Sequence, residues 1–240
     1  MMLRRIFLLL GFAAFVLVSP APIPYGYDVR AWQLADSTLV PIPLPPNTQT
    51  VQPLVSVDFD GNGTPERLAL SNGQASIQSG GKIRWKSPQA WQVRQAQVAD
   101  LNHDGLPEAV LLVWRPFNPW PVDAWLPNGG RIDKFHDSAG MSCHIILIGW
   151  YTGSFRERWA GSALAEPVKS FAVADLTGSG DQLLISLESE YDDPISTPAR
   201  RLKVWEWNGF GFTIVSIEDG PFSQLVIVAA DNGQQFILTP

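Results

Sequence analysis

Apolar and polar residues alternate along many short segments of this chain, and Gly, Pro, Asn and Asp separate the segments. Strict alternation over a few residues is typical of half-buried β-strands, whereas a surface helix repeats its apolar residues every three or four positions. Few segments carry the helical period. The pattern therefore predicts an all-β fold.

One kind of segment, which we call an AB hairpin, occurs three times without gaps and once in a shortened form. In each full copy an alternating apolar strand leads into a polar loop, and a second apolar strand follows. The full copies are Val55–Leu70, Ala96–Leu111 and Phe171–Ser186, and the shortened copy is Gln224–Leu238. In the shortened copy the loop is reduced to Asp231-Asn232-Gly233, which predicts a tight hairpin turn.

A second kind of segment, the CD hairpin, also repeats. Val29–Leu44 aligns on Leu202–Ile217, Ile148–Trp159 shares the Trp-to-Phe interval, and Ser76–Trp85 is a shortened version. Tryptophans recur at matching positions in these repeats, which predicts that they pack between repeats rather than bind a ligand: Trp32, Trp85, Trp159 and Trp205.

The order of the hairpins along the chain predicts how the repeats assemble. The sequence begins with an unpaired CD hairpin, continues with three AB-CD units and ends with an unpaired AB hairpin. Pairing of the two terminal hairpins would complete a fourth unit and leave no open edge, as in a closed β-propeller. We therefore expect four blades closed by the N- and C-terminal hairpins. The alternatives are an open array or a sandwich, and the complementary ends argue against both.

Two AB loops carry an alternating pattern of oxygen-bearing side chains. Counted from the first Asp, positions 1, 3, 5 and 9 are polar and position 6 is Gly, which permits a sharp turn. Such hard oxygen ligands suit Ca²⁺, with the carbonyl of position 7 as a further ligand. The predicted ligands are Asp58, Asp60, Asn62, Thr64 and Glu66 in loop one, and Asp100, Asn102, Asp104, Leu106 and Glu108 in loop two. The alternative is a turn in which the Asx side chains only cap the backbone.

The spacing excludes an EF-hand, because position 12 is Ala69 or Leu111 and the flanking segments alternate like strands. The third loop keeps Asp175 at position 1 but has Leu183 at position 9. We expect this loop to keep the turn and to have lost the metal.

The segments "DFDGNGTPE" and "DLNHDGLPE", each after an apolar strand, resemble the FG-GAP/VCBS-type repeats of integrin-α-like propellers. The resemblance covers the chain from about Tyr25 to the end and implies a calcium-binding propeller over residues 22–240. It implies no particular activity, because the family includes adhesion modules, lectins and accessory domains of enzymes. The chain departs from the family in its blade count and in the third and fourth loops.

Composition narrows the classes of partner. The chain of 240 residues is 45% hydrophobic and carries a net charge of −6 without a basic patch, which argues against a nucleic-acid partner. Its single cysteine, Cys143, excludes an internal disulfide. Near the N-terminus Arg4 and Arg5 precede an apolar run from Ile6 to Val18, which predicts an exported protein with a signal peptide or an uncleaved signal anchor at residues 1–21.

The longest departure from the repeat is a Pro-rich insertion at residues 115–141. It carries three aromatic residues that form a candidate binding surface for a protein or a glycan: Phe117, Trp120 and Trp125. An equally supported alternative is that these rings cap the propeller channel. A second insertion spans Glu190–Arg200.

These patterns predict a non-enzymatic, calcium-stabilised module outside the cytoplasm. The alternative is a hydrolase or lyase that uses acids on the face opposite the calcium loops: Asp123, Asp133, Asp192 and Asp193. His136, Cys143 and His144 lack the paired spacing of a zinc site, and Cys143 and His144 point to opposite faces of a predicted strand.

Overall fold

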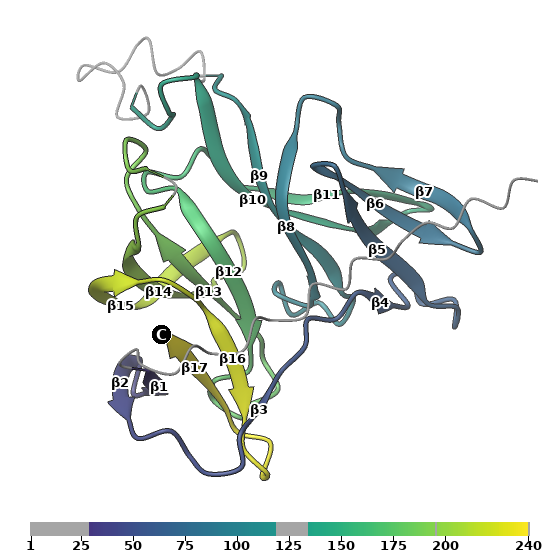
Figure 1. The fold of residues 1–240 in the computed structure, drawn as a ribbon. Helices are drawn as coiled ribbons and strands as arrows, with labels where there is room; N and C mark the ends of the chain where they lie inside the picture. Colours follow the sequence, from purple (N-terminus) through teal and green to yellow (C-terminus); the bar gives the residue numbers. More distant parts are fainter. Residues whose placement is uncertain (1–28, 119–133, 195, 240) are drawn as a thin grey trace, which may run out of the picture.

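The computed structural model describes residues 29–118, 134–194 and 196–239. Within these residues every regular element is a β-strand, and the strands form four antiparallel sheets (Figure 1). The sheets are arranged in a ring, as in a four-bladed propeller. The prediction of an all-β propeller from the repeat pattern is therefore confirmed.

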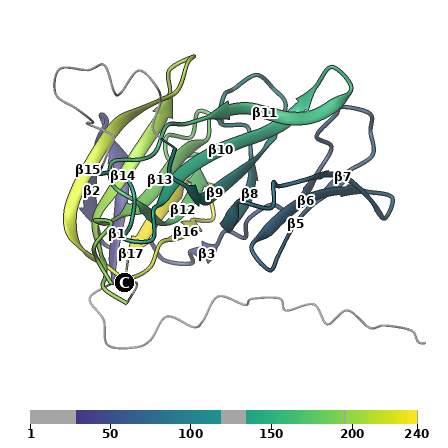
Figure 2. The same ribbon diagram turned by 90° about the horizontal axis from the view of Figure 1, so that it is seen from above.

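The first three blades each contain one AB and one CD hairpin, in the predicted order from the innermost strand outward. Blade one consists of β4 (Ser56–Val57), β5 (Glu66–Ser71), β6 (Gln74–Ser79) and β7 (Lys82–Lys86). Blade two consists of β8 (Gln92–Ala99), β9 (Glu108–Pro116), β10 (Met141–Tyr151) and β11 (Ser154–Ala160). Blade three consists of β12 (Val168–Ala174), β13 (Leu183–Glu188), β14 (Ala199–Trp207) and β15 (Phe212–Phe222). The blades follow one another in the view from above, with β5 to β7 at one end and β1 and β2 at the other (Figure 2).

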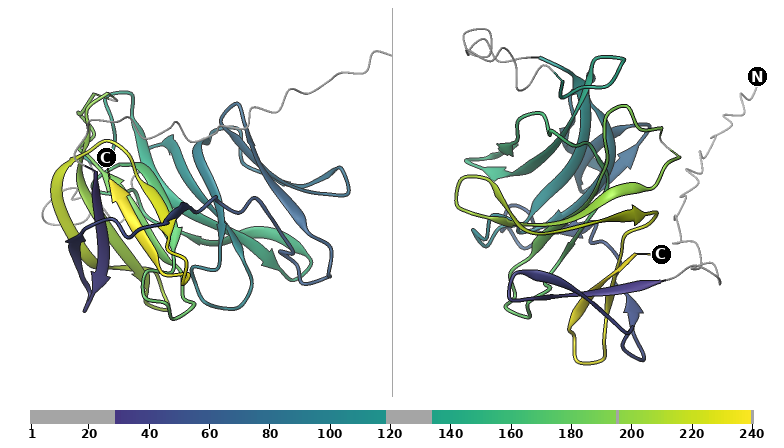
Figure 3. Two further views of the ribbon diagram at one scale, coloured as in Figure 1. Left: turned by 60° about the horizontal axis from the view of Figure 1, so that its bottom comes forward. Right: turned by 90° about the vertical axis from the view of Figure 1, so that its left-hand side faces the viewer.

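Blade four joins the two ends of the chain. It consists of β1 (Arg30–Ala35), β2 (Thr38–Ile42), β3 (Gln49–Thr50), β16 (Val226–Ala229) and β17 (Gln235–Thr239). β1 pairs with β17, so that Trp32 lies opposite Ile237, and the Trp32 Nε1–H donates to Thr239 Oγ1 at 2.8 Å. The N-terminal strands lie beside the C-terminal ones in both views of Figure 3. The predicted closure by terminal hairpins is confirmed.

Three hydrophobic clusters fill the junctions between successive blades. Phe59 and Ile77 pack with Ile146 between blades one and two. Phe171 and Leu184 pack with Leu147 between blades two and three, and the next junction contains strands of blades three and four. The four repeated tryptophans lie in or against these clusters, as the repeat predicted: Trp32, Trp85, Trp159 and Trp205.

The segment from β3 to β4 links blade four to blades two and one, and the sequence pattern did not predict it. The Val51 N–H donates to the Ile227 carbonyl of β16, and β3 forms a fifth strand beside β16. Three residues later the Leu54 carbonyl accepts the Val98 N–H of β8. The segment thereby forms the fourth wall of a central cavity of about 650 Å³, whose other walls are β8, β12 and β16.

Around this cavity, glutamine side chains form hydrogen bonds to the backbone of the adjacent blade. The Gln95 amide accepts the Phe171 N–H at 2.9 Å and donates to the Phe171 carbonyl at 2.6 Å. Gln182 accepts the Asp100 N–H, and Gln235 accepts the Asp175 N–H in the same way. The first residue of the second loop and that of the third loop are therefore each held in place by the next blade.

Candidate metal-binding loops

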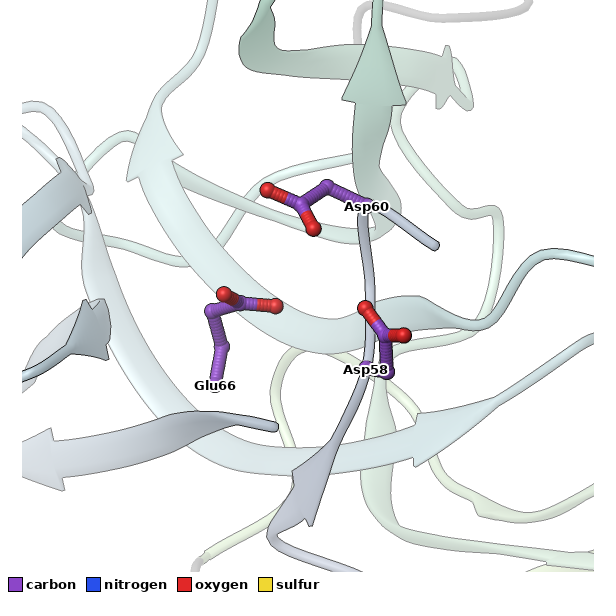
Figure 4. A group of neighbouring side chains, drawn as sticks. All are labelled: Asp58, Asp60 and Glu66. Atoms are coloured by element: carbon purple, nitrogen blue, oxygen red, sulfur yellow. The ribbon is translucent and has the colours of Figure 1, made fainter. Parts of the chain in front are cut away.

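Loop one connects β4 to β5, and its side chains converge on one point. Asp58 accepts the backbone N–H groups of Asn62 at 3.1 Å and Gly63 at 2.6 Å, so its carboxylate lies inside the turn. Gly63 has φ of +83°, the left-handed conformation expected for the sixth position. The carboxylates of Asp58, Asp60 and Glu66 point toward one another (Figure 4), with one oxygen of each within 4.8 Å of the others.

Loop two connects β8 to β9 and repeats this geometry. Asp100 accepts the N–H groups of Asp104 at 3.2 Å and Gly105 at 2.9 Å. Gly105 also has φ of +83°. The carboxylates of Asp100, Asp104 and Glu108 gather within the same 4.8 Å limit. Both loops therefore bring together the three acids that the spacing had singled out in each.

The glutamate at position 9 is the most informative residue of each loop. Glu66 and Glu108 are buried, with exposed fractions of 0% and 1%. One oxygen of Glu66 accepts the Phe59 N–H at 3.1 Å, and Glu108 accepts the Leu101 N–H. Glu66 Oε1 and Glu108 Oε2 are buried without any hydrogen-bond partner. A buried carboxylate oxygen without a partner is costly, so a cation in this position would stabilise the fold.

The charges of loop two also indicate that the loop would be stabilised by a cation or a proton. Burial, together with the nearby charges of Asp104 and Asp100, raises the pKa of Glu108 to about 8. Three carboxylates at this separation repel one another unless one is protonated or a cation neutralises them. The loop is therefore built around a positive charge or a proton.

Among the other predicted ligands, the asparagine side chains cap backbone N–H groups of the turn. Asn62 Oδ1 accepts the Thr64 N–H at 2.8 Å, and Asn102 Oδ1 accepts the Asp104 N–H at 2.9 Å. Asn102 Nδ2 also donates to Glu108 Oε1. The Leu106 N–H donates to Asp104, and the use of the Thr64 and Leu106 carbonyls as ligands stays a prediction.

The third loop satisfies Asp175 with its own hydrogen bonds. Burial acts to raise the pKa of Asp175, but donors from Gly180, Gly178 and Thr177 outweigh that effect and the pKa lies below its ordinary value. Gly178 and Gly180 keep the positive φ angles of the other loops, at 76° and 94°. The turn is retained without the acidic cluster, because Leu183 occupies position 9 inside the core.

Arg158 belongs to loop two, although the sequence pattern did not single it out for this role. Its guanidinium donates to Asp104 Oδ2 at 2.9 Å, and its stem packs against Gly149. A Cβ on Gly149 would lie 2.8 Å from Arg158 Cγ and 3.2 Å from Glu108 Cγ. A register shift between β10 and β11 at this point redirects the side chain. The only sequence signal was the repeated Arg-Trp pair, Arg84-Trp85 and Arg158-Trp159.

The opposite end of the ring contains part of the predicted aromatic insertion. Strand β9 ends at Pro116 and β10 begins at Met141, so the connection between these two strands runs over residues 117–140. Phe117 packs on His136 with 5.0 Å between ring centroids, and it is not among the described residues that line the central cavity. Trp120 and Trp125 lie outside the described residues.

The acids of the alternative enzymatic interpretation are only partly described. Asp123 and Asp133 lie outside the described residues, and Asp192 is exposed. Asp193 accepts a hydrogen bond from Arg200 at 2.5 Å and another from the Glu190 N–H at 3.0 Å. Asp193 is therefore already engaged within its own loop.

Cys143 and His144 lie on opposite faces of β10, as predicted. Burial raises the pKa of Cys143 to about 12 and lowers the pKa of His144 to about 4, so both are uncharged at neutral pH. The Gly161 carbonyl accepts from His144 Nδ1–H at 3.0 Å, which leaves Nε2 to accept the Ser142 hydroxyl at 2.8 Å.

Comparison with protein-family models, curated proteins and solved structures finds no match. In the part of the chain that the structure describes, no helix has the length and apolar character needed to cross a membrane.

Proposed function

We propose that the chain is a calcium-stabilised propeller of the FG-GAP/VCBS type. One observation carries the metal proposal: in each of two loops a buried glutamate has an unpartnered oxygen, and its carboxylate clusters with those of two aspartates. Turn caps alone would not require a buried glutamate at position 9. The third loop has the same turn without such a residue, which supports a separate role for Glu66 and Glu108.

Calcium is the cation that best fits this donor set. Carboxylate, amide and carbonyl oxygens are hard ligands, and no His or Cys takes part in either described cluster. Zn²⁺ would favour His and Cys, and Mg²⁺ would require a more rigid octahedral shell.

We further propose a non-enzymatic role as an exported module that binds a protein or a glycan. The charge pattern of residues 1–18 supports export, by a cleaved signal or a membrane anchor. The Pro-rich aromatic insertion with Phe117, Trp120 and Trp125 supports a binding surface. A hydrolase or lyase with acids on that face is the second candidate, and the pairing of Asp193 with Arg200 weighs against it.

Thermal unfolding of the exported fragment, residues 22–240, tests the metal proposal. Because a ligand of the folded state raises its stability, Ca²⁺ should raise the melting temperature and EDTA should lower it. Sites of exported modules often bind in the range of about 10⁻⁴ to 10⁻³ M, so millimolar concentrations should suffice.

Single substitutions assign the response to the loops. Asp60→Ala and Asp104→Ala should each remove part of the calcium-dependent shift, whereas the matched change Asp175→Ala in the third loop should leave the shift intact. A melting curve that neither Ca²⁺ nor EDTA displaces would exclude calcium binding.

A further inference from the structure

A groove lies beside loop two, between the outer hairpins of blades two and three. Its volume is about 440 Å³, and it is shallow and largely open to solvent. Loop two, the β10–β11 hairpin and the end of β14 supply its lining: Asn102, Asp104, Tyr151, Arg156, Glu157, Arg158 and Trp207. Phe117 follows the far end of β9, so this groove and the aromatic insertion lie at opposite ends of that strand.

Two arginines of the groove form cation–π contacts with the same aromatic ring. The guanidinium carbons of Arg156 and Arg158 lie 5.1 and 4.9 Å from the centre of the Tyr151 ring. Arg156 also donates to the hydroxyls of Thr152 at 3.2 Å and Ser154 at 3.1 Å. These contacts hold the Arg156 side chain in one orientation before a ligand binds. Binding then costs less side-chain conformational entropy.

The charges of the pair are incompletely neutralised. Within the described residues Arg158 forms one ion pair, with Asp104, and Arg156 forms none. A guanidinium has five N–H donors in a planar fork, so both side chains keep donors for a further anion. A carboxylate accepts two parallel N–H bonds from such a fork, so it suits the remaining donors.

Trp207 supplies an aromatic wall of the groove. Trp207 packs edge-to-face against Trp159 at 6.0 Å and Phe212 at 5.3 Å, which fixes its position in the wall. Phe210, in the turn that follows Trp207, is 89% exposed. An aromatic wall beside a cationic pair favours a ligand that has one apolar face and one anionic group.

We propose that this groove binds an acidic sugar, with its carboxylate on Arg156 and Arg158 and a pyranose face against Trp207. Glu157 and Asn102 line the same groove and can hydrogen-bond to sugar hydroxyls. The inference rests on the proposed role as a binding module and gives that module a ligand class. It does not require calcium in loop two.

Calorimetric titration with a tetrasaccharide that alternates glucuronate and N-acetylglucosamine tests the proposal. The same sugar with its carboxylates reduced to alcohols is the matched neutral probe, and acetate tests the carboxylate alone. We expect the acidic sugar to bind and the reduced sugar to bind at least about tenfold more weakly. Equal binding of the two sugars, or no binding of the acidic sugar at about 10 mM, would overturn the proposal.

Variants locate the site. Arg156→Ala and Arg158→Ala should each weaken binding about tenfold or more, because a bidentate contact is lost. Arg84→Ala, at the equivalent repeat position of blade one, should bind the sugar like the unaltered chain. If Arg156→Ala binds the sugar with unchanged affinity, the groove is not the site.

The two proposals fail separately. Arg156 does not contact an acidic loop, so Arg156→Ala should keep the full calcium-dependent melting shift. A chain that responds to calcium but does not discriminate the acidic sugar disproves only the groove, and the reverse result disproves only the metal.

Discussion

Glu108 shows at the scale of one residue why binding of the proposed cation would be linked to folding. Its side chain is buried, one oxygen has no partner, and Asp100 and Asp104 lie beside it. Without a cation the folded chain must either protonate this carboxyl or tolerate the repulsion. A raised pKa of about 8 corresponds to protonation at neutral pH.

The sign of the resulting pH dependence follows from the two states. Below about pH 4.5 the carboxyl is protonated in both the folded and the unfolded chain. Between pH 4.5 and about 8 the unfolded chain ionises first, so metal-free stability falls as the pH rises through this range. One pKa unit is worth about 1.4 kcal/mol, which limits the effect to roughly 5 kcal/mol.

Glu108→Gln should therefore act in opposite directions with and without calcium. In EDTA at pH 8 the variant should melt at a higher temperature than the unaltered chain, and the difference should vanish near pH 4.5. In saturating Ca²⁺ the variant should be the less stable protein, because it lacks a ligand. Glu157→Gln, an exposed acid on β11, is the control. A variant that is less stable in EDTA at pH 8 would contradict this account.

Residue-scale chemistry was predictable where it depends on local spacing. The aspartates and the glutamate of each loop lie within nine residues of one another. Their proximity could therefore be predicted from the sequence without the three-dimensional fold. The pairing of Arg158 with Asp104 spans 54 residues and depends on a register shift and on Gly149. No local pattern contains that information.

Strands β13 and β14 carry a buried ionic network at the scale of elements. Lys203 donates to Glu188 at 2.7 Å and to Glu166 at 2.8 Å, and the Ser186 hydroxyl also donates to Glu188 at 2.6 Å. Lys203 and Glu188 have side-chain exposures of 8% and 3%. The network ties the middle strands of blade three to the segment before β12.

Lys203→Ala should strongly destabilise the fold, since it leaves Glu188 buried without its cation. We expect a loss of about 3–5 kcal/mol in urea unfolding. The double change Lys203→Met with Glu188→Leu removes both charges and should cost clearly less. Arg200→Ala breaks an exposed ion pair in the same blade and should change stability little. If the double variant is as unstable as the single one, packing rather than charge explains the loss.

Elements were predictable where they repeat. Each AB and CD hairpin has relatives within the chain, so weak periodicity in one copy is supported by the others. β3 has no repeat counterpart and only two residues, Gln49 and Thr50. It forms because the chain must pass from the outer edge of blade four to the innermost strand of blade one, and this path runs beside the free edge of β16.

The whole molecule depends on strands from both ends of the chain. Blade four takes β1, β2 and β3 from the N-terminal part and β16 and β17 from the C-terminal part. Ile227 and Ile237 also belong to the cluster shared with blade three. Complementary half-blades in the sequence predicted this closure, because an unpaired hairpin at either end would expose a strand edge.

Deletion of residues 224–240 should therefore abolish cooperative unfolding. The truncated chain would lose β16 and β17, expose the edges of β1 and β3, and remove two isoleucines from the junction with blade three. We expect aggregation and a broad thermal transition.

A synthetic peptide of residues 224–240, added in trans, should restore a cooperative transition by occupying the positions of the missing strands. The same peptide with Ile237→Asp should fail, because a charge would enter a core position that is 0% exposed. A truncated chain that stays monomeric and unfolds cooperatively without the peptide would contradict closure by the terminal hairpins as the basis of stability.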